Sequence, residues 1–205
     1  MSKKYFFLLP LFIIGIASPL FVASAAHAHI GTHETNGFIH GFQHPLDGLD
    51  HILAMVAVGL WASQLGRRAI WALPLTFMGV MLVGGTIGMN TSLNLPGVEP
   101  AILASDLVLG GLILATIRLS IPISTSLVGI MAIFHGYAHG TEMPTQVSSL
   151  EYATGFIFAT ALLHAIGLGT ALIIQKYRQS QLVQFAGAGI MLGSLVLSAK
   201  FALGN

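Results

Sequence analysis

Six apolar segments, each long enough to cross a lipid bilayer, constrain the fold of this sequence more than any other feature. A transmembrane helix needs about 20 consecutive, mostly apolar residues, and lipid offers no hydrogen-bond partners to irregular backbone. Only 7% of the residues are charged, 55% are hydrophobic, and the mean hydropathy is +0.84. The sequence therefore predicts an all-α fold, a polytopic membrane helix bundle with six transmembrane helices. The expected segments are 38–64, 69–89, 99–118, 122–140, 150–175 and 181–203.

The residues before the first apolar segment have the pattern of a cleaved signal peptide. Lys3 and Lys4 give a basic start, YFFLLPLFIIGIA is apolar, and ASAAHA offers small-residue cleavage sites. An uncleaved first transmembrane helix is the alternative, which the A-x-A pattern disfavours. We expect a signal peptide over residues 1–28 and a six-span membrane domain over residues 29–205. The mature chain would then begin at His29 or two residues before it.

Basic side chains fall in alternate loops, which predicts an orientation in the membrane. If the mature N-terminus lies outside the cytoplasm, five basic residues lie on the cytoplasmic side and only Lys200 lies toward the outside. The five are Arg67, Arg68, Arg118, Lys176 and Arg178. We expect a multi-pass protein of the plasma (inner) membrane with both termini on the periplasmic side. The acidic residues then gather at the outer side, which the positive-inside rule does not explain because acidic residues respond to it only weakly.

Charge and cysteine content exclude several functions and site types. The net charge of +1 gives no basic footprint, so no nucleic-acid partner is expected. The chain has no cysteine, which excludes disulfides, thiolate zinc sites and iron–sulfur clusters. It also lacks a G-x-x-x-x-G-K-[ST] loop, so it cannot hydrolyse ATP by itself. A metal site must therefore use His, Asp, Glu, Met, backbone or water.

The stretch HGFQHPLDGLDH, residues 40–51, concentrates histidines and aspartates at the start of the first expected segment. A charged side chain near the middle of a membrane helix costs about 2.5–3.5 kcal/mol, and a bound divalent cation would offset that cost. Proline is best tolerated in the first helical turn, so a helix is expected to begin near Pro45 with His44 at the junction. His44, Asp47 and His51 would share one face of a continuous helix. His51 would then lie about 10 Å further along the axis than His44.

A second cluster, FHGYAHGTEMP, covers residues 134–144. His135 and His139 are four residues apart on one helical face, and Glu142 joins them if the helix continues. The pentads HGFQH and HGYAH resemble each other, and we interpret them as converging on one site at the outer side. Imidazole and carboxylate without sulfur suit borderline ions such as Ni²⁺, Co²⁺ or Zn²⁺. His164, alone in the fifth segment, is interpreted as the donor of an interhelical hydrogen bond.

The stretch HPLDGLDHILAM, residues 44–55, resembles the signature H-P-x-x-G-x-D-H-x-x-x-M of the HupE/UreJ family, and every fixed position matches. That family comprises nickel and cobalt permeases associated with hydrogenase and urease maturation, and FHGYAHGTE is similar to its second motif. The resemblance implies a secondary transporter for uptake of Ni²⁺ or Co²⁺ and not an enzyme. The ion would be cargo with no permanently bound cofactor, and a cytoplasmic metallochaperone would be a partner. The implied metal path comprises His44, Asp50, His51, His139 and Glu142, followed with less weight by His135, Glu99 and Met55.

Two residues outside that implied path remain candidates for binding metal. Asp47 occupies a variable position of the signature. His29, at or near a newly processed N-terminus, could use its imidazole and a free amine to capture metal outside the cell. The alternative function is a membrane-embedded histidine-box metalloenzyme or b-haem protein, because H-x-x-x-H occurs in each of the two clusters. A purely structural subunit would explain the apolar segments but not the two clusters.

Overall fold

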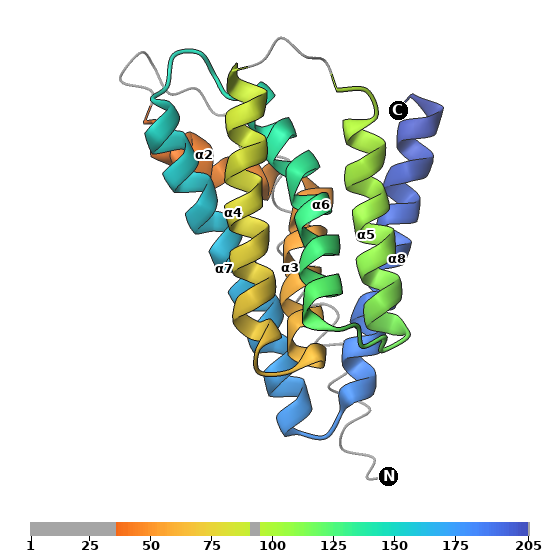
Figure 1. The fold of residues 1–205 in the computed structure, drawn as a ribbon. Helices are drawn as coiled ribbons and strands as arrows, with labels where there is room; N and C mark the ends of the chain where they lie inside the picture. The colour runs from red at the N-terminus through yellow and green to blue at the C-terminus, as the bar shows by residue number, and fades with distance from the viewer. Residues whose placement is uncertain (1–35, 91–94, 205) are drawn as a thin grey trace. The chain divides into compact units, whose positions relative to one another are not determined.

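The structure, a computed structural model, describes residues 36–90 and 95–204; the expected signal peptide and His29 lie outside the described residues. The described part is built of helices without strands, as the sequence predicts (Figure 1). The helices are α2 (Gly37–Asp47), α3 (Leu49–Leu65), α4 (Ala69–Asn90), α5 (Val98–Leu114), α6 (Ile121–Thr141), α7 (Ser149–Lys176) and α8 (Ser180–Leu203).

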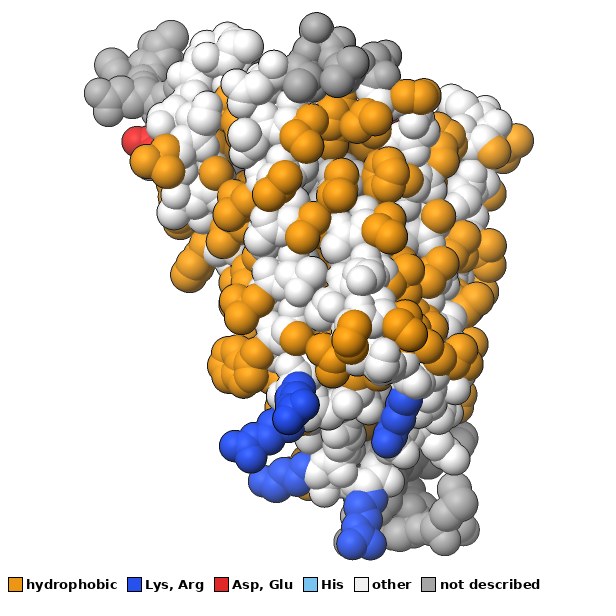
Figure 2. Space-filling view, viewed as in Figure 1, with side chains coloured by type: hydrophobic (Ala, Val, Ile, Leu, Met, Phe, Trp, Pro, Cys, Tyr) orange, Lys and Arg blue, Asp and Glu red, His pale blue; other side chains and the backbone are white. Residues whose placement is uncertain are grey.

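Length and hydropathy make several of these helices suitable for crossing a membrane. Within the described residues, α4, α6, α7 and α8 qualify individually, and α2 with α3 qualifies as a fifth, bent by 84°. Helix α5 occupies the third expected segment but has only 17 residues, because it ends at Leu114 instead of continuing to residue 118. Large hydrophobic side chains are exposed along the sides of the helices (Figure 2). The fold is that of a multi-pass membrane protein.

Basic side chains gather at one end of the described bundle (Figure 2). The turns between α3 and α4, between α5 and α6, and between α7 and α8 lie at that end, the lower end of Figure 1. They carry or adjoin Arg67, Arg68, Arg118, Lys176 and Arg178. Trp71 and Tyr177 lie next to these turns with 71% and 69% of their surface exposed, as amphipathic rings do at a membrane–water interface.

Glycines let several helix pairs approach closely, which replaces the hydrophobic driving force that helices lack in lipid. A Cβ atom on Gly41 of α2 would clash with the backbone of Tyr152 in α7. A Cβ on Gly136 of α6 would clash with the backbone of α4, and Gly110 of α5 and Gly187 of α8 face each other in the same way. Side chains near these contacts are therefore held by backbones that cannot move apart without losing the packing.

The junction between α2 and α3 differs from the prediction. His44 and Pro45 lie inside α2, and the chain breaks three residues later, at Gly48, whose φ of −99° and ψ of 118° are extended. The helix begins earlier because Asn36 caps it, with Oδ1 accepting a hydrogen bond of 3.2 Å from Ile39 N. The expectation of a helix starting near Pro45 was wrong because this cap supplies an earlier start.

Candidate metal site

The bend at Gly48 brings His44 and His51 of the first histidine cluster together. The ring centroids of His44 and His51 are 6.5 Å apart, so the two imidazoles are neighbours and not stacked along one continuous helix. From α6, the His139 ring lies 4.7 Å from His44 and 4.5 Å from His51, and the His135 ring lies 5.4 Å from His51. The two sequence clusters therefore meet, and four imidazoles from three helices form one group, here called the outer cluster.

His51 and His135 share an arrangement typical of metal-ligating histidines. His51 Nδ1 donates to Asp50 Oδ1 at 2.9 Å, and His135 Nδ1 donates to the Met131 carbonyl at 3.0 Å. Since carboxylate and carbonyl oxygens only accept, Nδ1 carries the proton and the neutral ring presents a lone pair at Nε2. Both Nε2 atoms are buried and have no hydrogen-bond partner in the described part of the chain. Holding Nδ1 in this way fixes the tautomer and orients Nε2 toward a metal.

His139 is fully buried, and neither of its ring nitrogens has a hydrogen-bond partner among the described residues. In addition to its contacts with His44 and His51, the His139 ring packs against Phe156 of α7, with the two ring centroids 5.0 Å apart. An unsatisfied buried polar group costs about 1–3 kcal/mol. A cation bound between these rings would remove that cost, and imidazole nitrogen is a ligand type that borderline ions such as Ni²⁺, Co²⁺ and Zn²⁺ favour.

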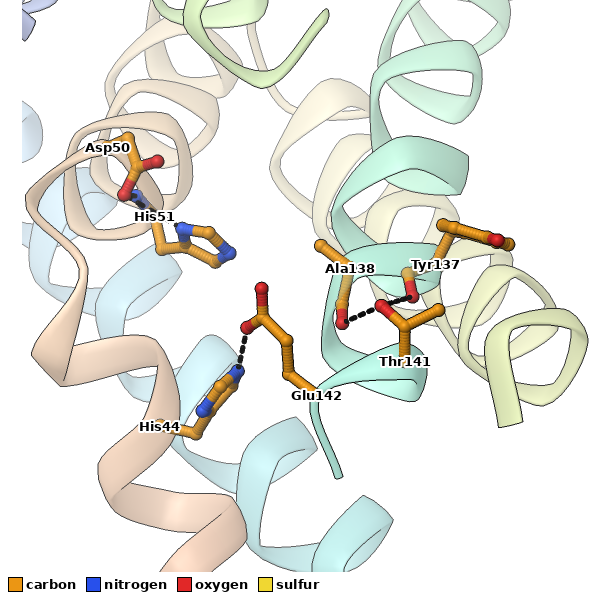
Figure 3. Close-up of polar contacts among 7 residues, drawn as sticks. All are labelled: His44, Asp50, His51, Tyr137, Ala138, Thr141 and Glu142. Carbon is orange, nitrogen blue, oxygen red and sulfur yellow. Dashed lines mark hydrogen bonds and ion pairs between the residues drawn. The ribbon is translucent and has the colours of Figure 1, made fainter. Parts of the chain in front are cut away.

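Glu142 closes the outer cluster from the end of α6. Its Oε2 accepts a hydrogen bond of 3.1 Å from His44 Nε2, and Figure 3 shows its carboxylate between the His44 and His51 rings. The Thr141 hydroxyl donates to the Ala138 carbonyl at 2.8 Å, which holds the last turn of α6. The hydrogen bond from His44 lowers the pKa of Glu142, so this half-exposed carboxylate stays ionised at neutral pH.

A pocket of about 350 Å³ opens beside the outer cluster at the end opposite the basic turns. Glu99 from the first turn of α5 and Glu142 from the end of α6 both line it, together with Tyr137 and Phe201. Glu99 is exposed, so its carboxylate stands at the rim of the pocket. The structure thus places two carboxylates at one pocket.

The remaining predicted residues lie apart from the four imidazoles. Asp47 is exposed in the last turn of α2 and makes no hydrogen bond or ion pair with any described residue. Met55 is fully buried in the apolar core of the helices. Within residues 36–90 and 95–204, no three His, Asp or Glu side chains are placed to hold one ion together.

Three residues near the cluster were missed from the sequence. The Tyr152 ring lies 5.8 Å from His44, and the fully buried Phe77 ring lies 5.4 Å from His135. Asp106 is fully buried in α5, and neither of its carboxylate oxygens has a partner among the described residues. Asp106 could have been found as an acidic residue inside an apolar segment, whereas an aromatic residue in such a segment carries no comparable signal.

The comparisons with known proteins agree on one family. The model of the family described as "HupE / UreJ protein" matches residues 17–197. Protein HupE of Rhizobium leguminosarum bv. viciae is 42% identical over 178 residues, which cover 87% of this chain and 92% of that protein. No solved structure matches the chain.

Proposed function

Because the chain belongs to the HupE/UreJ family, we propose that it is a secondary transporter that takes up Ni²⁺ or Co²⁺ across the plasma membrane and supplies a hydrogenase or urease under maturation. One observation carries the proposal: four imidazoles from three helices converge beside the carboxylates of Asp50 and Glu142, with buried ring nitrogens lacking partners in the described chain. Membership of a transport and accessory family also favours a transporter over a histidine-box enzyme.

Carboxylates line the pocket and imidazoles lie behind them, an order that suits capture of a divalent ion followed by selection among such ions. The ion first meets the carboxylates of Glu99 and Glu142 in the pocket, which attract any divalent cation. It then passes to His51 and His139, whose imidazoles favour Ni²⁺, Co²⁺ or Zn²⁺ over Mg²⁺ and Ca²⁺. His44, hydrogen-bonded to Glu142, lies between the two stages. Release of Glu142 from His44 would let both side chains turn to the ion.

The proposed topology has six spans, with α2 and α3 as the first and the short helix α5 as the third. The signal peptide over residues 1–28 is removed, and both termini lie outside. This orientation puts the five basic residues of the lower turns on the cytoplasmic side, as the positive-inside rule requires. The outer cluster and its pocket then face the periplasm, from which the ion comes.

The membrane potential can supply the driving force. One charge gains about 2.3 kcal/mol per 100 mV, so a divalent ion gains about 4.6 kcal/mol from 100 mV, inside negative. At about 1.4 kcal/mol per factor of ten, that energy sustains a gradient of over a thousandfold. A proton gradient or trapping by a cytoplasmic metallochaperone would add to it.

Uptake of radiolabelled nickel and cobalt by cells expressing the chain tests the proposal, with zinc and magnesium as competitors. His51→Ala should abolish uptake of both ions. His40→Ala is the matched control, because His40 is an exposed histidine of α2, one turn before His44. Membrane abundance is measured for each variant. Equal uptake by the His51 and His40 variants at equal abundance would refute the proposed path.

A further inference from the structure

His164 of α7 combines an interhelical hydrogen bond with a free ligand atom. Its Nδ1 donates to the Met55 carbonyl of α3 at 2.7 Å, which is the hydrogen bond expected from the sequence. The carbonyl can only accept, so Nδ1 holds the proton and Nε2 presents a lone pair. Nε2 is buried and has no partner among the described residues, in a residue that is only 2% exposed. His164 thus repeats the arrangement of His51 and His135 at a different depth.

Thr160 places a second unsatisfied atom on the same face of α7. It precedes His164 by four residues, so the two side chains lie one above the other, about 6 Å apart along the axis. Thr160 is fully buried, and its Oγ1 also lacks a partner in the described chain. A threonine inside a membrane helix usually bonds back to its own helix. This one leaves its hydroxyl oxygen available.

Two routes connect His164 with the outer cluster. Met55, whose carbonyl it contacts, follows His51 by one turn of α3, about 6 Å along that helix. The Phe77 ring lies 5.2 Å from His164 and 5.4 Å from His135, so one aromatic ring contacts both imidazoles. An ion leaving the outer cluster would therefore find the next imidazole behind one aromatic ring.

The position of His164 along α7 is close to the middle of the helix. Twelve residues separate it from Tyr152 beside the outer cluster, about 18 Å, and eleven from Gln175, about 16 Å. Gln175 lines a polar pocket of about 280 Å³ at the basic end, together with Gln64 and Gln184. Binding positions near the midplane, between two polar ends, are the usual arrangement in secondary transporters.

We propose that His164 Nε2 and Thr160 Oγ1 form a second binding position for the transported ion, here called the inner station, separated from the outer cluster by Phe77. The inner station rests on the proposed transport function. One imidazole and one hydroxyl bind a divalent ion weakly, and water or a backbone carbonyl completes its coordination. Weak binding suits an intermediate position on a transport path, because the ion must leave as readily as it arrives.

The test uses two substitutions that separate the two nitrogens of His164. His164→Asn keeps an N–H donor near the position of Nδ1, so the Met55 contact can persist while the ligand at Nε2 is lost. His164→Gln loses the Met55 donor but places an amide near the position of Nε2. Each full-length variant is assayed for nickel uptake in cells and for nickel retention in detergent, which reports capture by the outer cluster. Thermal unfolding in detergent shows whether each variant is folded, and its abundance in the membrane gives the amount.

The inner station predicts that His164→Asn lowers nickel uptake at least tenfold, relative to the amount of folded protein. The loss should be at least as large as that caused by His164→Gln. Nickel retention by His164→Asn should stay within about threefold of the original chain. Uptake by His164→Asn that equals the original, or clearly exceeds that of His164→Gln, would show a structural role only and overturn the proposal. Loss of retention in folded His164→Asn would also overturn it, because the two positions would not be separate.

A third substitution, Thr160→Val, keeps the shape of the side chain and removes its hydroxyl. It should lower uptake several-fold with retention unchanged, and unchanged uptake would overturn the inner station as proposed. If His164→Asn fails to fold, uptake by Thr160→Val tests the inner station instead. If the original chain neither retains nor takes up nickel or cobalt, the proposed function itself fails, which is a different result from all of these.

Discussion

Replacing Asp50 by asparagine should weaken nickel binding without removing a histidine. Asp50 Oδ1 accepts hydrogen bonds of 2.9 Å from both Nδ1 and the backbone N of His51. The two side chains are only 18% and 11% exposed, so solvent screens the contact little. Asparagine can still accept these bonds but carries no charge. A charge-assisted hydrogen bond contributes about 1.5–3 kcal/mol, against about 1 for a neutral one.

The loss of about 1–2 kcal/mol corresponds to a nickel dissociation constant roughly five- to thirtyfold higher, within the range of about 10–100-fold found when partners of ligating histidines are changed. Asp50→Ala should weaken binding further, because Nδ1 would lose its acceptor. Retention of radiolabelled nickel by the detergent-purified protein measures the nickel affinity of both Asp50 variants. Asp47→Asn is the matched control, since Asp47 is an exposed aspartate without a hydrogen bond to any described residue. Equal affinity for Asp50→Asn and Asp47→Asn would refute the orienting role of Asp50.

Two further predictions concern the bend and the pH. A Cβ atom on Gly48 would lie 2.8 Å from Asp50 Oδ1 and 3.0 Å from His51 Nδ1, so Gly48→Ala should displace this pair and lower nickel affinity about tenfold. Gly79→Ala, in open space on α4, should leave nickel affinity unchanged. Equal nickel affinity of the two variants would refute the role of the Asp50–His51 pair. Imidazole must be neutral to ligate and protons compete with the ion for its nitrogens, so nickel binding in detergent should weaken as the pH is lowered. The lowered pKa of Glu142 keeps that carboxylate ionised at neutral and mildly acidic pH, so the loss should arise from the histidines, and pH-independent binding would contradict their ligation.

The helical fold and the two clusters could be predicted from the sequence because each rests on a local signal. Apolar segments of bilayer length predict membrane helices whatever their neighbours are. Histidine and carboxylate inside such segments predict a site because their burial is costly. The pentads ending at His44 and His139 were similar enough to suggest one site, and the two rings do lie in contact range.

The position of the bend could not be predicted because two local signals compete. Pro45 suggests a helix start, but the cap at Asn36 starts the helix earlier and moves the break to Gly48. The role of Phe77 also depends on tertiary packing, since only the fold places its ring in contact with both His135 and His164. A sequence shows which side chains can ligate but not which nitrogen of each ring is already engaged.

Nickel flux into vesicles containing only the purified chain tests the central claim most directly. With an inside-negative potential, the vesicles should accumulate radiolabelled nickel, cobalt should compete, and an excess of magnesium should not. His139→Ala should reduce this flux to that of empty vesicles, whereas His40→Ala should not change it. Flux no greater than in empty vesicles, or flux unaffected by loss of His139 in folded protein, would contradict transport through the outer cluster.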